Sequence, residues 1–164
     1  MTKRAPKASR PEMPGYGLPE NNKGLLPWKW ADQRLAKSHN YWITTVRPDG
    51  RPHTMVVWGL WRESTFYFST GRDSQKSRNL AANPNCIVCN ERAQEAVIVE
   101  GEAAEVRDPA LRKRFFRLYE RKYNFDMAPY EKEPIYAVQP VKAFGLDEKL
   151  SLSRATRWMF SRSS

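Results

Sequence analysis

Residues 66–84 read FYFSTGRDSQKSRNLAANP, and this stretch decides the fold because it joins a short apolar strand, a polar turn and a helix. Ser69 and Thr70 end the strand with two hydroxyl groups, and Gly71 lets the chain turn sharply after them. The residues that follow predict a helix over about 74–82. Strand, turn and helix therefore bring several polar groups to the start of that helix.

The start of this helix is suited to binding a phosphate. Asp73 or Ser74 can cap it, and Lys76 and Arg78 follow in its first turns. Free N–H groups, the positive end of the helix dipole and two cations all favour an anion there. The same residues also describe an ordinary solvated surface helix, so both interpretations stay open at this point.

Further strand patterns on both sides of this stretch predict an antiparallel sheet. Two of them flank Asp49-Gly50, which is a strong hairpin signal. Gly101 is a candidate bulge or a site of close backbone approach, and Pro140 predicts either a strand pair or one broken strand. Five to seven strands joined by short turns predict a closed or half-closed antiparallel barrel. The strand patterns lie at residues 40–46, 53–61, 65–70, 86–91, 96–107 and 135–146.

Two more helices and an N-terminal arm complete the predicted organisation. Residues 1–24 are rich in Pro, Lys and Gly without periodicity, which predicts a flexible or surface-wrapping arm before a single domain at 25–164. Pro27 precedes a helix that is expected to plug one end of the core, with an apolar stripe of Trp28, Ala31 and Leu35. A second helix begins at Asp108-Pro109 and runs to about Tyr123, with one face formed by Leu111, Phe115, Leu118 and Tyr119.

Length and composition indicate a soluble, single-domain protein. The chain has 164 residues, 40% of them hydrophobic, which is enough for a real core. No apolar run approaches the ~20 residues needed to cross a bilayer. The first residues, MTKRAPKASRP, carry charge without a following apolar region, so they do not resemble a secretory signal. We therefore expect a cytoplasmic protein that does not bind membranes.

The cysteines and histidines do not predict a metal or redox centre. Cys86 and Cys89 lie in the strand pattern CIVC, where residues three apart point to opposite faces, so a structural role is expected. His39 and His53 are the only histidines, and no metal site follows from ligand spacing.

The net charge of +10 raises the question of a nucleic-acid ligand. The positive charge in excess lies mainly in residues 1–30 and 149–164, and in residues 31–148 the positive and negative side chains nearly cancel. A balanced body with basic ends fits a compact anionic ligand better than a nucleic-acid backbone, although basic tails on RNA-binding proteins give the same pattern. We take the tryptophans that could stack on bases as core or interface: Trp28, Trp30, Trp42, Trp58 and Trp61.

From about Leu35 to Phe160 the chain resembles the flavin-binding split-barrel proteins related to pyridoxamine 5′-phosphate oxidase. The resemblance is carried by TVRPDGRPHTMVVWGLW, by FYFSTG followed by SQKSRNLAANP, and by the terminal SRATRWMF. It implies a mainly β, six-stranded antiparallel split barrel with a few short helices, and a homodimer with two flavin sites at its interface. The ATRW ending and the short length look more like the small FMN or deazaflavin (coenzyme F-420) reductases than like the oxidase itself.

The resemblance also implies a set of cofactor-binding residues. The strand that begins at His53 is expected to follow the edge of the flavin ring with its main-chain groups. The oxidase pattern resembles Ser-Arg-Lys at residues 74–76, and here Gln75 replaces its arginine. One phosphate contact of the family pattern is therefore missing. Arg157 is expected to meet an anion and Trp158 to cover a ring face, unless the tail simply docks on the barrel. The full set is His53, Met55, Val56, Val57, Trp58, Ser69, Thr70, Ser74, Lys76, Arg78, Asn79, Arg157 and Trp158.

The function that follows is a flavin-dependent oxidoreductase acting on a small-molecule substrate. A bound flavin itself carries hydride or electron transfer, so no catalytic side chain is assigned. FMN is the preferred cofactor because the compact pocket needs one phosphate, and the deazaflavin with its longer acidic tail is the alternative. A split barrel that only binds a flavin or haem, and a basic nucleic-acid-binding barrel, are the competing hypotheses.

Overall fold

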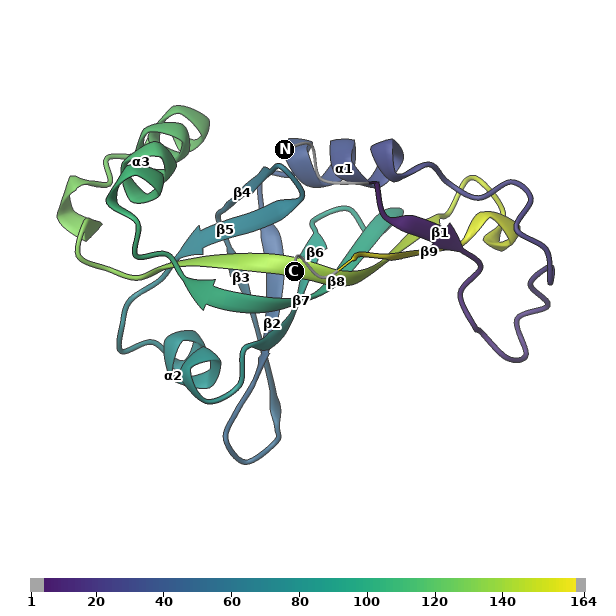
Figure 1. The fold of residues 1–164 in the computed structure, drawn as a ribbon, viewed down its shortest axis with the longest axis horizontal. Coiled ribbons are helices and arrows are strands. Elements are labelled where there is room, and N and C mark those ends of the chain that lie inside the picture. The colour runs from purple at the N-terminus through teal and green to yellow at the C-terminus, as the bar shows by residue number, and fades with distance from the viewer. Residues whose placement is uncertain (1–4, 162–164) are drawn as a thin grey trace.

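The computed structural model describes residues 5–161, in which antiparallel strands form one sheet that carries three helices (Figure 1). The strands are β1 (Lys7–Ser9), β2 (Tyr41–Val46), β3 (Pro52–Val57), β4 (Leu60–Arg62), β5 (Thr65–Ser69), β6 (Asn85–Asn90), β7 (Glu95–Glu105), β8 (Ile135–Asp147) and β9 (Thr156–Met159). The helices are α1 (Trp28–Lys37), α2 (Gln75–Ala82) and α3 (Pro109–Tyr123), with short 3₁₀ helices η1 (Ala128–Tyr130) and η2 (Leu152–Arg154).

The sheet divides along its longest strand. Its order is β1-β9-β8-β7-β6-β2-β3, and β4 is attached through β5, which pairs with β8. One edge of β8 pairs with β7, and the other edge pairs with β5 at residues 135–138 and with β9 at residues 142–145. Within residues 5–161, β1, β3 and β4 are edge strands. The fold is mainly β and antiparallel as predicted, but the described part of the sheet has nine strands rather than six and is not closed.

The extra strands have local causes. The pattern at 53–61 was predicted as one strand, but the chain leaves the sheet at Trp58 and Gly59 and forms β3 and β4. A side chain at Gly59 would lie 2.4 Å from the Phe66 ring, so only glycine fits this corner. The short strands β1 and β9 were not predicted, because three or four residues are too few for alternation to be recognised.

The predicted irregularity at Gly101 is confirmed. The register between β7 and β8 shifts after Glu100, so that Gly101 faces Pro140 and Val141 is the extra residue of a bulge. A β-carbon on Gly101 would lie 2.6 Å from the Gln139 carbonyl oxygen. The pattern around Pro140 is therefore one continuous strand, β8, because the bulge accommodates the residue that lacks an N–H.

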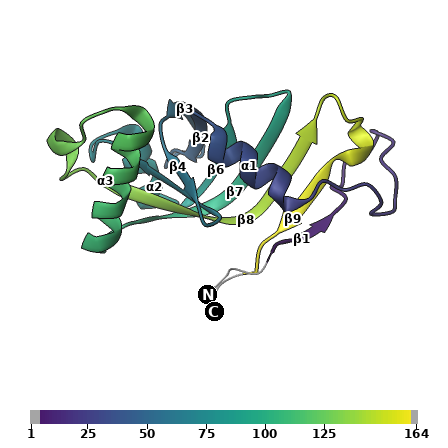
Figure 2. The ribbon, with the colours of Figure 1, turned by 90° about the horizontal axis from the view of Figure 1, so that it is seen from above.

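Figure 2 shows from above that α1 and α3 lie over different parts of the sheet, and each helix covers one of two apolar clusters. Helix α1 closes the main core with Ala31 and Leu35, both fully buried, as the apolar stripe predicted. Helix α3 begins at Asp108-Pro109 as predicted, with Asp108 as its cap, and covers a second cluster that includes Phe115 and Tyr119. Among the helices of residues 5–161, none is both long and apolar enough to span a lipid bilayer.

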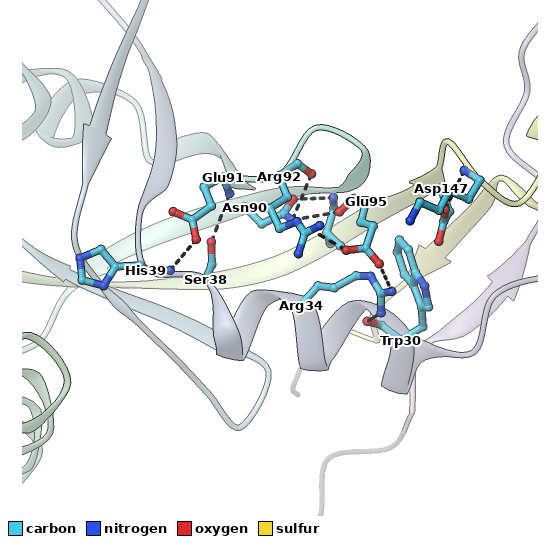
Figure 3. Close-up of polar contacts among 11 residues, drawn as sticks. Trp30, Arg34, Ser38, His39, Asn90, Glu91, Arg92, Glu95 and Asp147 are labelled. Carbon is cyan, nitrogen blue, oxygen red and sulfur yellow. Dashed lines mark hydrogen bonds and ion pairs between the residues drawn. The ribbon is translucent and has the colours of Figure 1, made fainter.

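Polar contacts attach α1 to the turn between β6 and β7 (Figure 3). Arg34 forms an ion pair with Glu95 and lies 4.0 Å over the Trp30 ring. The carboxylate of Glu91 accepts the His39 N–H at 3.0 Å just after the helix. These contacts fix α1, and the chain that leads from it into β2, against the turn between β6 and β7.

Part of the predicted arm lies against the C-terminal segment. β1 pairs with β9 through Ala8 and Trp158, among others. Arg10 is buried, and its guanidinium donates to main-chain carbonyls of both the arm and the C-terminal segment, including Lys23 at 2.8 Å and Ala155 at 3.1 Å. Residues 1–4 of the arm lie outside the described residues.

Candidate cofactor-binding site

Strand β3 offers an accessible main-chain edge. In residues 5–161 it pairs only with β2, so alternate N–H and C=O groups face away from the sheet. The side chains of Met55 and Val56 are each 45% exposed, whereas Val57 is buried. Donors and acceptors at fixed spacing along an open edge suit the polar rim of a planar heterocycle.

Arg47, His53 and Lys76 form a basic cluster near the start of β3. Burial lowers the pKa of His53, and the positive charges of Arg47 and Lys76 lower that pKa further. The Nδ1 atom of His53 is buried and has no hydrogen-bond partner among the described residues. Burial also lowers the pKa of Lys76, whose ammonium makes no hydrogen bond or ion pair within residues 5–161. A bound anion would supply the partner that both groups lack.

The predicted hydroxyl groups hold the turn between β5 and α2. Ser74, rather than Asp73, caps α2, and its Oγ accepts the N–H of Ser77 at 3.2 Å. The Thr70 hydroxyl donates to Ser74 Oγ at 3.2 Å, and the Ser69 hydroxyl donates to the Pro134 carbonyl at 3.0 Å. A phosphate would recruit the Ser69 and Thr70 protons only by exchanging existing bonds. Ser74 Oγ only accepts within residues 5–161, so its O–H, like the Lys76 ammonium, can bind a phosphate directly.

Asn79 anchors α2 to the sheet. Its side chain is fully buried, and Nδ2 donates to the Thr45 hydroxyl on β2 at 2.9 Å. Gln75 donates to Asn79 Oδ1 at 2.7 Å and accepts from Arg78 at 3.0 Å. Arg78 is exposed and also donates to the Asp73 carbonyl, so its guanidinium is held at the start of its own helix. Asn79 therefore positions the helix that carries Lys76, and Gln75 supports Asn79.

An aromatic pocket lies beside the hydroxyl groups. Its volume of about 320 Å³ is within the range of small-molecule sites. Trp58 borders it, with ring centroids 5.8 Å from Phe125 and 6.4 Å from Tyr119. One face of Trp58 stacks on Tyr123 at 4.6 Å, and its Nε1 donates to Asn40. The pocket is lined by Ser69, Thr70, Gly71, Tyr119, Phe125, Met127, Tyr130 and Glu133.

A buried polar network fixes the main chain next to Trp58. Lys122 Nζ donates to the Gly59 carbonyl at 2.9 Å and to the Tyr41 hydroxyl at 3.0 Å. Burial lowers the pKa of Lys122 to about 8, opposed by the negative charge of Glu91. Burial likewise raises the pKa of Tyr41 and of Tyr123, whose hydroxyl accepts the Gly59 N–H at 2.9 Å.

Within one chain, Arg157 and Trp158 are separated from the edge of β3 and from the basic cluster. They lie on β9, with β8, β7, β6 and β2 between them and β3. Trp158 is fully buried and packs 5.3 Å from Trp28, so its indole docks the C-terminal strand on the core. Arg157 Nε donates to the Ser9 hydroxyl at 3.1 Å, and its guanidinium lies 3.8 Å from Glu12.

The two cysteines are free thiols. Cys86 is buried and Cys89 partly buried, and burial raises the pKa of both, that of Cys86 to about 12. Both are therefore poor nucleophiles at neutral pH, in agreement with the predicted structural role. Among residues 5–161, no three His, Cys, Asp or Glu side chains lie together as a metal site requires.

Sequence reasoning missed Arg47 in the basic cluster and the aromatic pocket. Arg47 could have been found, because the predicted hairpin places the end of its first strand beside the start of the second. Tyr119 was identified as core from its helical spacing, and it is 8% exposed while also lining the pocket. Spacing alone does not distinguish a core ring from one at a pocket wall.

Sequence comparison relates the chain to pyridoxamine 5′-phosphate oxidase, whose family model matches residues 29–144. The pyridoxine/pyridoxamine 5′-phosphate oxidase of Bacteroides thetaiotaomicron is 32% identical over 124 residues, which cover 71% of this chain and 54% of that protein. The chain therefore spans about half the length of this curated relative.

Solved structures share the fold. An F-420 reductase superposes with a TM-score of 0.59 at 24% identity, covering 68% of this chain and 94% of the other. HutZ, the haem storage protein from Vibrio cholerae, superposes with a TM-score of 0.59 at 15% identity, covering 67% of this chain and 87% of the other. At these identities the likeness concerns the fold alone.

Proposed function

The chain belongs to the pyridoxamine 5′-phosphate oxidase family, and from this premise we propose that it is a flavin-dependent oxidoreductase with FMN as its cofactor. The observation that carries the proposal is the basic cluster, in which the buried His53 Nδ1 and the Lys76 ammonium lack partners within residues 5–161. This cluster adjoins the open edge of β3. The two features match the charged end and the polar rim of a flavin nucleotide.

The residues have separate roles in this proposal. Lys76 and His53 bind the phosphate, and Asn79 keeps Lys76 in place by anchoring α2. Main-chain groups of Met55 to Val57 bind the polar rim of the ring. When bound, the flavin supplies hydride or electron transfer, and the aromatic pocket beside Trp58 receives the small-molecule substrate.

FMN fits the described contacts better than the deazaflavin. The longer acidic tail of the deazaflavin requires free cations along an exit path. Arg10 is instead enclosed by main-chain carbonyls, so its guanidinium does not serve such a path. The single phosphate of FMN needs only the basic cluster.

A homodimer is part of the proposal, because an apolar row crosses one sheet face, which also carries the Glu100–Lys142 ion pair. Register pairs place Val56 beside Trp42, Trp42 beside Cys89, and Ile98 beside Phe144 on that face. Trp42 is 47% exposed, which is unusual for a ring in the middle of a sheet. The same row continues to Arg157. In the proposed dimer the second copy docks on this face in the orientation that brings its Arg157 toward the site of the first.

A visible absorbance spectrum of the purified protein, recorded after addition of FMN and desalting, tests the cofactor. We expect a retained flavin spectrum that bleaches when the protein is reduced and recovers when an oxidised small-molecule acceptor is added. A retained flavin that no acceptor reoxidises indicates a binding module without turnover. A Soret band after haem addition, with no retained flavin, contradicts the proposal.

A further inference from the structure

The aromatic pocket beside Trp58 has a single charged side chain in its lining, that of Glu133. Three aromatic rings also line it, those of Tyr119, Phe125 and Tyr130, and no Lys, Arg or His of residues 5–161 does so. Phe125 is 38% exposed and Tyr130 45% exposed, so both rings are accessible to a ligand. The pocket therefore combines open aromatic surface with a negative charge.

Neighbouring groups hold Glu133 in place but leave part of its carboxylate unused. Its Oε2 accepts the main-chain N–H of Arg72 at 2.7 Å, and its carbonyl accepts from Arg112 at 3.0 Å. Of the two carboxylates near the Arg72 guanidinium, Glu105 is the one paired with it, at 3.1 Å. Within residues 5–161, Glu133 forms no ion pair, and its Oε1 accepts no hydrogen bond. A fixed carboxylate of this kind attracts a cation.

We propose that this pocket binds a small organic cation, with its ammonium group against the Glu133 carboxylate and the aromatic rings. The inference rests on the proposed function, because it names the substrate class of the same pocket. Aromatic rings attract a cation electrostatically, and the attraction is larger where water is excluded. A phosphate ester, such as the one for which the Bacteroides oxidase is named, meets the charge of Glu133 and finds no lining cation within residues 5–161.

A metal ion and a neutral ring fit this lining less well than an organic cation. A metal ion needs several ligand side chains, and among residues 5–161 no three His, Cys, Asp or Glu side chains lie together. A neutral aromatic ligand would pack on the rings but would withdraw the Glu133 carboxylate from water without giving it a partner, which costs free energy. An ammonium group satisfies the carboxylate and the rings together.

Isothermal titration calorimetry with the full chain tests the ligand class, using two probes of the same shape. The probes are choline and dimethylbutanol, its uncharged isostere with carbon in place of nitrogen. We expect choline to bind about tenfold more tightly than the alcohol. Glu133→Gln keeps an oxygen that can accept the Arg72 N–H, and it should weaken choline by about tenfold and the alcohol by no more than about twofold. Tyr130→Leu should weaken choline by about threefold.

A matched control separates the pocket carboxylate from overall charge. Glu131→Gln makes the same change in net charge at an exposed side chain outside the lining, and should leave choline affinity within about twofold. The inference is overturned if choline does not bind, if both probes bind equally, or if Glu133→Gln and Glu131→Gln act alike.

Retention of FMN, measured on the same samples, separates this inference from the proposed function. Failure of the choline expectations in protein that retains FMN overturns the ligand class alone. Choline binding that meets the expectations in protein that retains no FMN supports the ligand class and overturns the flavin-dependent function.

Discussion

Two neighbouring basic side chains, His53 and Lys76, give the candidate site its chemical character. Each lacks a polar partner in the described part of the chain, and each is partly withdrawn from water. Such groups favour a ligand that restores the lost interactions, and a phosphate does so for both.

Binding of FMN is expected to raise the pKa of His53, because the phosphate charge stabilises the imidazolium and opposes the effect of Arg47 and Lys76. Riboflavin, which lacks the phosphate, should leave that pKa unchanged. The chain has only two histidines, so an NMR titration of the imidazole resonances, assigned with His53→Gln, can follow both. Identical His53 titrations with FMN and riboflavin would place the phosphate elsewhere.

Lys122 is expected to make stability depend on pH. Its folded pKa of about 8 lies below the unfolded value of about 10.4, so between these values the unfolded state binds more protons and stability rises with pH. Its neutral amine can still donate to Gly59 and Tyr41. The buried thiols act in the opposite direction, so the difference between wild type and Lys122→Met isolates this group.

Urea unfolding at several pH values from 7 to 9.5 measures that difference. The interval stops before tyrosine ionisation, since the raised pKa values of Tyr41 and Tyr123 cost stability above about pH 10. A wild-type advantage that does not grow with pH over this interval would refute the role of Lys122.

At the scale of elements, α2 depends on one buried contact with β2. Asn79→Ala removes the hydrogen-bond partner of the Thr45 hydroxyl and is expected to lower the free energy of unfolding by about 1 to 3 kcal/mol. FMN affinity should fall as well, because Lys76 loses its fixed position.

Denaturant unfolding and FMN titration measure both effects of the Asn79 variant. Arg78→Ala is the matched control on the same helix, since Arg78 is exposed and should change stability by no more than about 0.5 kcal/mol. If Arg78→Ala weakens FMN binding more than Asn79→Ala does, the predicted phosphate contact of Arg78 outweighs the anchoring of α2.

The elements were predictable where local chemistry determines them. Ser74 and Asp108 begin α2 and α3, and Gly101 marks the bulge, because caps and close approaches leave a signal in a few adjacent residues. The break at Gly59 was missed, since it depends on Phe66 and Tyr123, which contact it only in the folded chain. The basic cluster was predicted in part: His53 and Lys76 were identified as site residues, and Arg47 was overlooked although the predicted hairpin places it near His53.

At the scale of the whole molecule, the apolar row across one face of the sheet predicts a homodimer. Light scattering at micromolar concentration is expected to give about twice the chain mass of 19.1 kDa. Trp42→Lys places a charge in the centre of this face and should yield a folded monomer. A wild-type monomer that binds one FMN per chain would contradict both the dimer and the role of Arg157 from the partner.

The central claim is that a flavin phosphate binds at Lys76, and the FMN-to-riboflavin affinity ratio tests it most directly, because the two ligands differ only in the phosphate. Fluorescence titration should show that Lys76→Met weakens FMN by about 10- to 150-fold, the equivalent of a lost charged hydrogen bond of about 1.5 to 3 kcal/mol. Riboflavin affinity should stay within about twofold of wild type. An unchanged ratio in Lys76→Met would contradict the claim.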